Sequence, residues 1–82
     1  MMNVQKKDGS MEPFDRNKIV MAVTSAGATT QEAAEVASGV EDWMPMAIAL
    51  GTVSTNQIRG KVIELLKQLN PTANAVYEVY KG

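Results

Sequence analysis

Apolar residues recur at helical spacing in successive stretches of the chain, which predicts amphipathic helices. The first helix begins after an N-cap at Asp15 and runs to about Ala26. The second begins after a cap at Thr30 and should break or kink after Met44, because Pro45 cannot continue the backbone hydrogen bonding of a helix. Their apolar stripes are Ile19, Ala22, Val23 and Ala26, and then Ala33, Val36, Ala37, Val40 and either Trp43 or Met44.

Two further helices are predicted in the second half of the chain. Ser54 and Gln57 have the spacing of a capping box, which marks the start of a third helix. Asn70 followed by Pro71 pairs an N-cap with proline at the first helical position, and this predicts a fourth helix. Residues 46–50 fit either a helical turn or the entry into a strand, and we assign a helical turn. The stripes are Ile58, Val62, Leu65, Leu66 and Leu69, and then Ala73, Val76, Tyr77 and Tyr80.

The N-terminal segment predicts a β-hairpin. Asp8 and Gly9 suit a two-residue turn because both positions tolerate positive φ, so they would join strands at 3–7 and 10–13. A lone hairpin is marginal in water, so it has to rest on another part of the fold. The predicted register places Lys7 opposite Ser10 and Gln5 opposite Glu12 on one face, and Val4, Lys6 and Met11 on the other.

This order of elements predicts an α+β fold. The helical stripes can bury one another in a four-helix bundle. Residues 51–53 look like a short extended piece that can join the hairpin. We therefore expect the bundle to be covered at one end by a small three-stranded lid.

Composition bounds the chemistry of the chain. Its 82 residues are 45% hydrophobic and 21% charged, which is typical of one small folded domain, here 1–82. The absence of cysteine and histidine excludes disulfides, zinc sites built on these residues and the usual general base, so we expect no enzyme. A net charge of -1 argues against direct nucleic-acid binding. Without a bilayer-spanning run or a signal peptide, we expect no membrane contact and a cytoplasmic location.

The charges are distributed unevenly. Basic residues lie in two separated segments, and acidic residues lie together between them. A fold that joins the basic segments would form an anion site on a mildly acidic protein. The basic residues are Lys6, Lys7, Arg16, Lys18, Arg59 and Lys61, and the acidic ones are Glu32, Glu35, Glu41 and Asp42.

Residues 4–19 resemble the opening signature of the ATP-cone family. The chain reads VQKKDGSMEPFDRNKI where the family pattern is VxKRDGxxExFDxxKI. Later landmarks, including Thr55 before the third helix and Tyr77 near the end, extend the resemblance over nearly the whole chain. It implies the ATP-cone fold and a regulatory module that binds ATP or dATP, which could carry Mg²⁺. ATP cones regulate ribonucleotide reductases and belong to a zinc-containing repressor of reductase genes.

The resemblance also implies a site and partners. The module would act allosterically, through nucleotide-dependent association with itself or with a ribonucleotide-reductase-like protein. The positions that match nucleotide contacts of the family are Val4, Lys6, Lys7, Glu12, Asp15, Lys18, Thr55 and Arg59.

Other interpretations of these residues stay open. Lys7 stands where the family has arginine, which keeps the charge but loses the bidentate fork. Asp15 and Thr55 can be helix caps only, and lysines beside a hairpin are usually solvated. The chain could be a degenerate cone that mediates protein contacts without a ligand. The resemblance covers one domain, so we expect a free-standing cone, and an excised part of a longer protein is the alternative.

Overall fold

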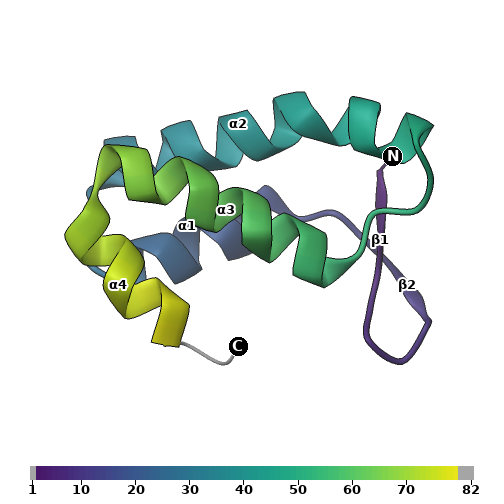
Figure 1. Cartoon of the computed structure of the whole chain (residues 1–82), viewed down its shortest axis with the longest axis horizontal. Helices are drawn as coiled ribbons and strands as arrows, with labels where there is room; N and C mark the ends of the chain where they lie inside the picture. The colour runs from purple at the N-terminus through teal and green to yellow at the C-terminus, as the bar shows by residue number, and fades with distance from the viewer. Residues whose placement is uncertain (1, 80–82) are drawn as a thin grey trace.

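The computed structural model describes residues 2–79 and has an α+β fold, as the sequence predicts. Within this part of the chain, helix α2 packs against α1 and α3, and α4 packs against α3 and α1. The hairpin lies at one end of the helices, beside the start of α3 (Figure 1). The elements are β1 (Asn3–Gln5), β2 (Met11–Pro13), α1 (Arg16–Ser25), α2 (Thr30–Ala49), α3 (Thr55–Leu69) and α4 (Pro71–Val79).

The turn of the hairpin has three residues rather than the predicted two. The Lys6 amide donates to the Ser10 carbonyl at 2.8 Å, and the Gly9 amide donates to the Lys6 carbonyl at 3.0 Å. Gly9 has φ of 90°, which is the glycine position of a three-residue hairpin loop. The Asp8 carboxylate accepts from the Ser10 amide at 2.9 Å and from its hydroxyl at 2.6 Å, which stabilises this turn and lowers the pKa of Asp8.

The longer turn shifts the register of the two strands by one residue. Val4 lies opposite Glu12, so the predicted pairs of Gln5 with Glu12 and of Lys7 with Ser10 are wrong. A shift of one residue exchanges the faces of a strand relative to its partner. As a result, Val4 is buried, with 3% of its surface exposed, and Glu12 lies on the same face of the ribbon.

The lid has two strands instead of the predicted three. The Gln5 amide donates to the Val53 carbonyl at 2.8 Å, and Gln5 and Ser54 form a single parallel bridge. The segment goes no further as a strand because Ser54 and Gln57 form the predicted capping box, so α3 begins at Thr55. The hairpin is therefore attached directly to the residues that precede α3.

A break or a kink was predicted after Met44, and the break does not occur, because helix α2 continues through Pro45. Met44 is fully buried, and the partly buried Trp43 and Ala47 pack against the core on either side of the proline. Burial of these side chains offsets the hydrogen bond that proline removes. The assignment of residues 46–50 to a helical turn is thereby confirmed up to Ala49, with Leu50 as the C-cap.

The N-cap of α2 is Thr29, not the predicted Thr30. Its hydroxyl accepts from the Glu32 amide at 3.1 Å, and the Glu32 carboxylate accepts from the Thr29 amide at 2.9 Å. Asn70 donates to the same carboxylate at 3.1 Å, while its carbonyl oxygen accepts from the Ala73 amide at 3.0 Å and caps α4. The Thr29 bond, aided by Asn70, lowers the pKa of Glu32.

The core lies where α1, α2 and α3 meet and includes most of the predicted stripe positions. Three of the predicted stripe residues are exposed, namely Ala22, Leu69 by 40% and Val76 by 44%. Tyr80 lies outside the described residues. Among residues 2–79, no helix is long and apolar enough to cross a membrane. The largest fully buried side chains are Met44, Leu66, Val23, Val36, Val40, Val53 and Val62.

We predict that Leu66→Ala destabilises the protein by about 2 to 5 kcal/mol, because it opens a cavity in a close-packed core. Leu66 is fully buried, whereas Leu69, one turn further along α3, is 40% exposed. Leu69→Ala is the matched control and should cost clearly less. Urea denaturation followed by circular dichroism measures both, and equal losses would contradict this description of the core.

Candidate functional site

A small cavity lies between the hairpin and the first turns of α1 and α3, with a volume of about 140 Å³. Its apolar walls come from the buried Val4 and from Phe14, Ile19 and Ile58. Strand pairing positions β1, and the N-caps Asp15 and Ser54 fix where α1 and α3 begin beside the cavity. The cavity can enclose a small apolar or aromatic group. Its remaining lining residues are Pro13, Glu12, Asp15, Lys18 and Thr55.

A larger, cationic cleft of about 390 Å³ adjoins this cavity, because Lys18, Ile19, Thr55 and Ile58 line both. Its positive charges come from three different elements: Lys7 in the hairpin turn, Lys18 on α1 and Arg59 on α3. The first turn of α3 also directs backbone N–H groups toward its N-terminal end, where anions are favoured. The cleft is therefore suited to an anionic group. Its other lining residues are Ala22, Asn56 and Tyr77.

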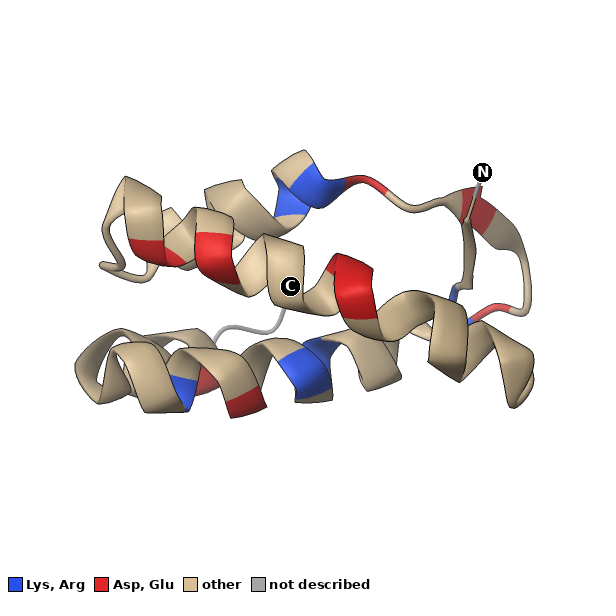
Figure 2. Ribbon diagram, turned by 90° about the horizontal axis from the view of Figure 1, so that it is seen from above, with Lys and Arg blue, Asp and Glu red and all other residues tan. Residues whose placement is uncertain are grey.

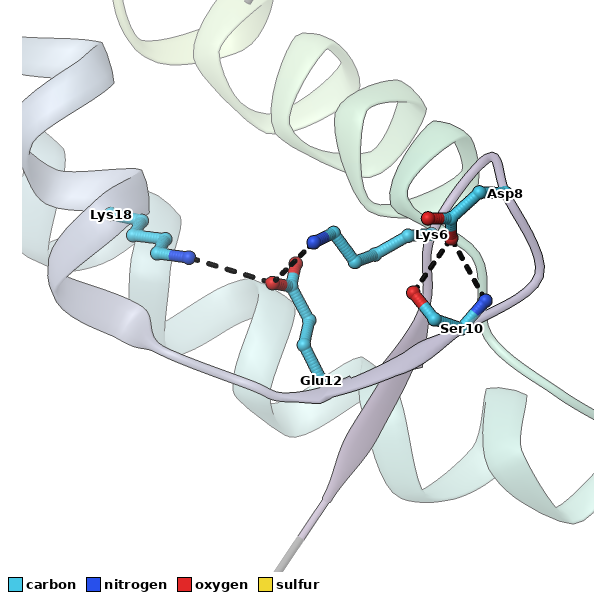
Figure 3. A network of polar contacts seen from close by, with 5 residues as sticks. All are labelled: Lys6, Asp8, Ser10, Glu12 and Lys18. Atoms are coloured by element: carbon cyan, nitrogen blue, oxygen red, sulfur yellow. Dashed lines mark hydrogen bonds and ion pairs between the residues drawn. The ribbon is translucent and has the colours of Figure 1, made fainter.

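Glu12 holds two lysines at the junction of the hairpin and α1. Its Oε2 atom lies 3.9 Å from Lys6 Nζ and 3.7 Å from Lys18 Nζ (Figure 3). The Lys18 side chain is 69% exposed, so this pair adds little to stability and is easily exchanged for another anion. In the described part of the chain, Lys6 lines neither the small cavity nor the cationic cleft. It reaches the site only through its ion pair with Glu12, which lines the cavity.

Arg59 has partners on α4. Its Nη2 atom donates to the carbonyl oxygens of Tyr77 at 3.3 Å and Glu78 at 2.9 Å, at the C-terminal end of that helix. The guanidinium carbon also lies 5.0 Å from the centre of the Tyr77 ring, a cation–π contact. Burial raises the pKa of Tyr77, so the phenol stays neutral.

Asp15 and Thr55 have local roles in addition to their place at the cavity. The Asp15 carboxylate accepts from the Asn17 amide at 3.0 Å and caps α1, as predicted. Thr55 is the first residue of α3 and follows the cap Ser54, so it is not the cap itself. Both side chains line the small cavity, which is compatible with a second role toward a ligand.

Two of the basic residues in the predicted segments form ion pairs and do not line the cleft. Arg16 binds Glu41 on α2 at 2.8 Å and Ser38 at 3.3 Å, while Lys61 pairs with Glu64 at 3.4 Å. The charged residues of α2 are all acidic, and in Figure 2 this helix carries red positions between its two neighbours. The cationic cleft thus lies away from the acidic helix.

Sequence reasoning missed part of the lining of both hollows. Ile19 and Ile58 are predicted only to form the buried stripes of their helices, yet both line the small cavity together with Phe14. Asn56 sits in the first turn of α3, where a polar side chain is a weak signal for a ligand. Tyr77 could not be found from local patterns, because only the packing of α4 on α3 brings it beside Arg59.

The residues of the site are suited to binding a ligand. Among residues 2–79, no three histidine, cysteine or acidic side chains are grouped so that they could hold a metal ion. An apolar cavity that opens into a cationic cleft fits a ligand with a flat ring system at one end and negative charge at the other.

The fold and this site define a small binding module of the α+β class, and comparison identifies its family. The model of the ATP cone domain matches residues 2–81, so the chain belongs to the ATP-cone family. ATP cones are nucleotide-binding regulatory domains rather than catalytic ones, and they bind ATP or dATP as allosteric ligands. A comparison with curated protein sequences finds no match.

Proposed function

We propose that this protein binds ATP or dATP at the junction of the hairpin, α1 and α3, and that the bound nucleotide changes how the protein associates. The observation that carries the proposal is the convergence of Lys7, Lys18 and Arg59 on one cleft that adjoins an apolar cavity. These cations come from distant parts of the sequence, and their meeting point is a favourable position for several phosphates.

The adenine ring is proposed to enter the small cavity between Val4, Ile19 and Ile58. Glu12 and Asp15 at its rim offer carboxylate oxygens to the adenine amino group or to a ribose hydroxyl. The triphosphate would then extend into the larger cleft, toward Thr55 and the first-turn amides of α3.

The ion pairs of Glu12 support this arrangement. Lys6 and Lys18 both lie within 4 Å of its carboxylate, and phosphate oxygens would compete with that carboxylate for their ammonium groups. Lys7 would add a point charge where an arginine would give a bidentate contact. A Mg²⁺ ion carried by the triphosphate stays a prediction.

The proposed output is a change in association with a second copy or with a ribonucleotide-reductase-like protein. A ligand shifts such an equilibrium only as far as its affinities for the two states differ. The hairpin is a suitable moving part, because its turn is exposed and Lys7 lies in it. A cytoplasmic location is part of this proposal.

We predict that ATP binds much more tightly than AMP, because two further phosphates reach the cations of the cleft. Isothermal titration calorimetry at low salt measures both affinities, and ATP binding should weaken as salt screens exposed charges. Equal affinities would contradict the proposed phosphate site. If neither nucleotide binds or raises the melting temperature, the chain is a degenerate cone that serves protein contacts.

We predict that Lys18→Ala weakens ATP binding about 10-fold or more, since a charge-assisted hydrogen bond contributes about 1.5 to 3 kcal/mol. The fold should be unchanged, because the Lys18 side chain is 69% exposed. Lys67→Ala, an exposed change in the last turn of α3, is the matched control and should bind like the unchanged protein. Calorimetry and circular dichroism together separate loss of the site from loss of the fold.

We predict that saturating ATP or dATP changes the sedimentation coefficient of the protein, alone or mixed with a reductase-like partner. The expected cause is ordering of the hairpin by phosphate contacts, which fixes the surface around it. Identical sedimentation without nucleotide and with each nucleotide, together with unchanged hydrogen exchange across residues 4–13, would leave a passive nucleotide binder.

A further inference from the structure

The C-terminal turn of α4 is held to α3 by a residue of the candidate site. Arg59 donates to the carbonyl oxygens of Tyr77 and Glu78 and lies over the Tyr77 ring. Carbonyl groups at a helix C-terminus have no partner within the helix and carry partial negative charge, so a cation there is stabilising. In this structure the Arg59 guanidinium is that cation.

Apart from Tyr77, which is partly buried against the core, little else buries this turn. The buried residues of α4 are Ala73 and Asn74, both in its first half. Further along, Val76 is 44% exposed and Val79 is 77% exposed. The described part of α4 has nine residues, and a helix segment of that length is marginal without packing, so the order of its last described turn depends on the packing of Tyr77 and on the contacts that Arg59 makes.

The same guanidinium lines the cationic cleft with Lys7 and Lys18, and Tyr77 lines it too. The contacts with α4 use only Nη2, so an anion in the cleft would attract the other N–H donors of Arg59 and draw the guanidinium away from the α4 carbonyl groups. Paired phosphate oxygens are stronger acceptors for a guanidinium than neutral carbonyl groups, because the hydrogen bonds are charge-assisted and can be bidentate.

We propose that Arg59 is a latch between the ligand and α4. With no anion in the cleft it caps the C-terminal turn of α4, and a polyphosphate in the cleft withdraws it and loosens that turn. The inference rests on the proposed nucleotide function and adds a second responsive element to the hairpin. Binding would thus be transmitted to the end of α4, far from the hairpin turn in the sequence.

Hydrogen exchange of the α4 amides tests the latch on the full chain, in parallel with calorimetry on the same sample. Saturating ATP should speed exchange at residues 77–79 by about three-fold or more, as expected for a turn that loses its stabilising contacts. Adenosine, which has no phosphate, should leave exchange there unchanged. ATP that binds by calorimetry but leaves exchange at these residues the same or slower would overturn the latch.

Variants separate this inference from the proposed function. Arg59→Met should already show fast exchange at residues 77–79 without nucleotide, and ATP should cause no further rise. Arg59→Lys keeps the charge but loses the planar guanidinium. Its exchange rate at residues 77–79 without nucleotide should lie between the rates of the unchanged protein and of Arg59→Met. Lys18→Ala should keep slow exchange without nucleotide, because its side chain points to Glu12 rather than α4. Normal exchange in Arg59→Met would refute the latch, whereas absence of ATP binding to the unchanged protein would refute the nucleotide function itself.

Discussion

The hydrogen bond from the Gln5 amide to the Val53 carbonyl, at 2.8 Å, fixes the hairpin to the residues before α3, and the site depends on this attachment. A hairpin of two short strands has too little buried surface to hold a position by itself. Attachment through the main chain brings Val4 into the core and lays Glu12 beside α1. Without it, the small cavity would lose the wall that the hairpin provides.

Helix starts supply the other walls, and their electrostatics are consistent with an anionic ligand. Asp15 caps α1 and Ser54 caps α3, so both helices begin at the same hollow. Lys18 lies in the first turn of α1 and Arg59 just beyond the first turn of α3, and near a helix start a cation is mildly unfavourable because the helix dipole is positive there. Glu12 offsets this for Lys18, and the α4 carbonyl groups offset it for Arg59. Lys18 and Arg59 are thus held by replaceable partners.

The helices were predictable from the sequence because their stripes and caps are local signals. The Ser54 box and the Asn70 cap were correct for that reason. The hairpin register was not predictable, because Asp8 and Gly9 fit a two-residue or a three-residue turn equally well and the choice depends on burying Val4. The passage of α2 through Pro45 likewise depends on tertiary burial of Met44, which overrides the local preference to end the helix.

The candidate site likewise has parts that the sequence predicts and parts that depend on tertiary packing. Lys18 and Thr55 follow capping residues, so their position at helix starts could be inferred from sequence, whereas the contact of Arg59 with Tyr77 requires the packing of α4 on α3. That contact has a thermodynamic consequence. If the same guanidinium stabilises α4 and binds phosphate, each process weakens the other by the same factor, because coupling between two equilibria is reciprocal. Whatever stabilises the end of α4, including a partner that packs on its exposed turn, would then lower the affinity for nucleotide.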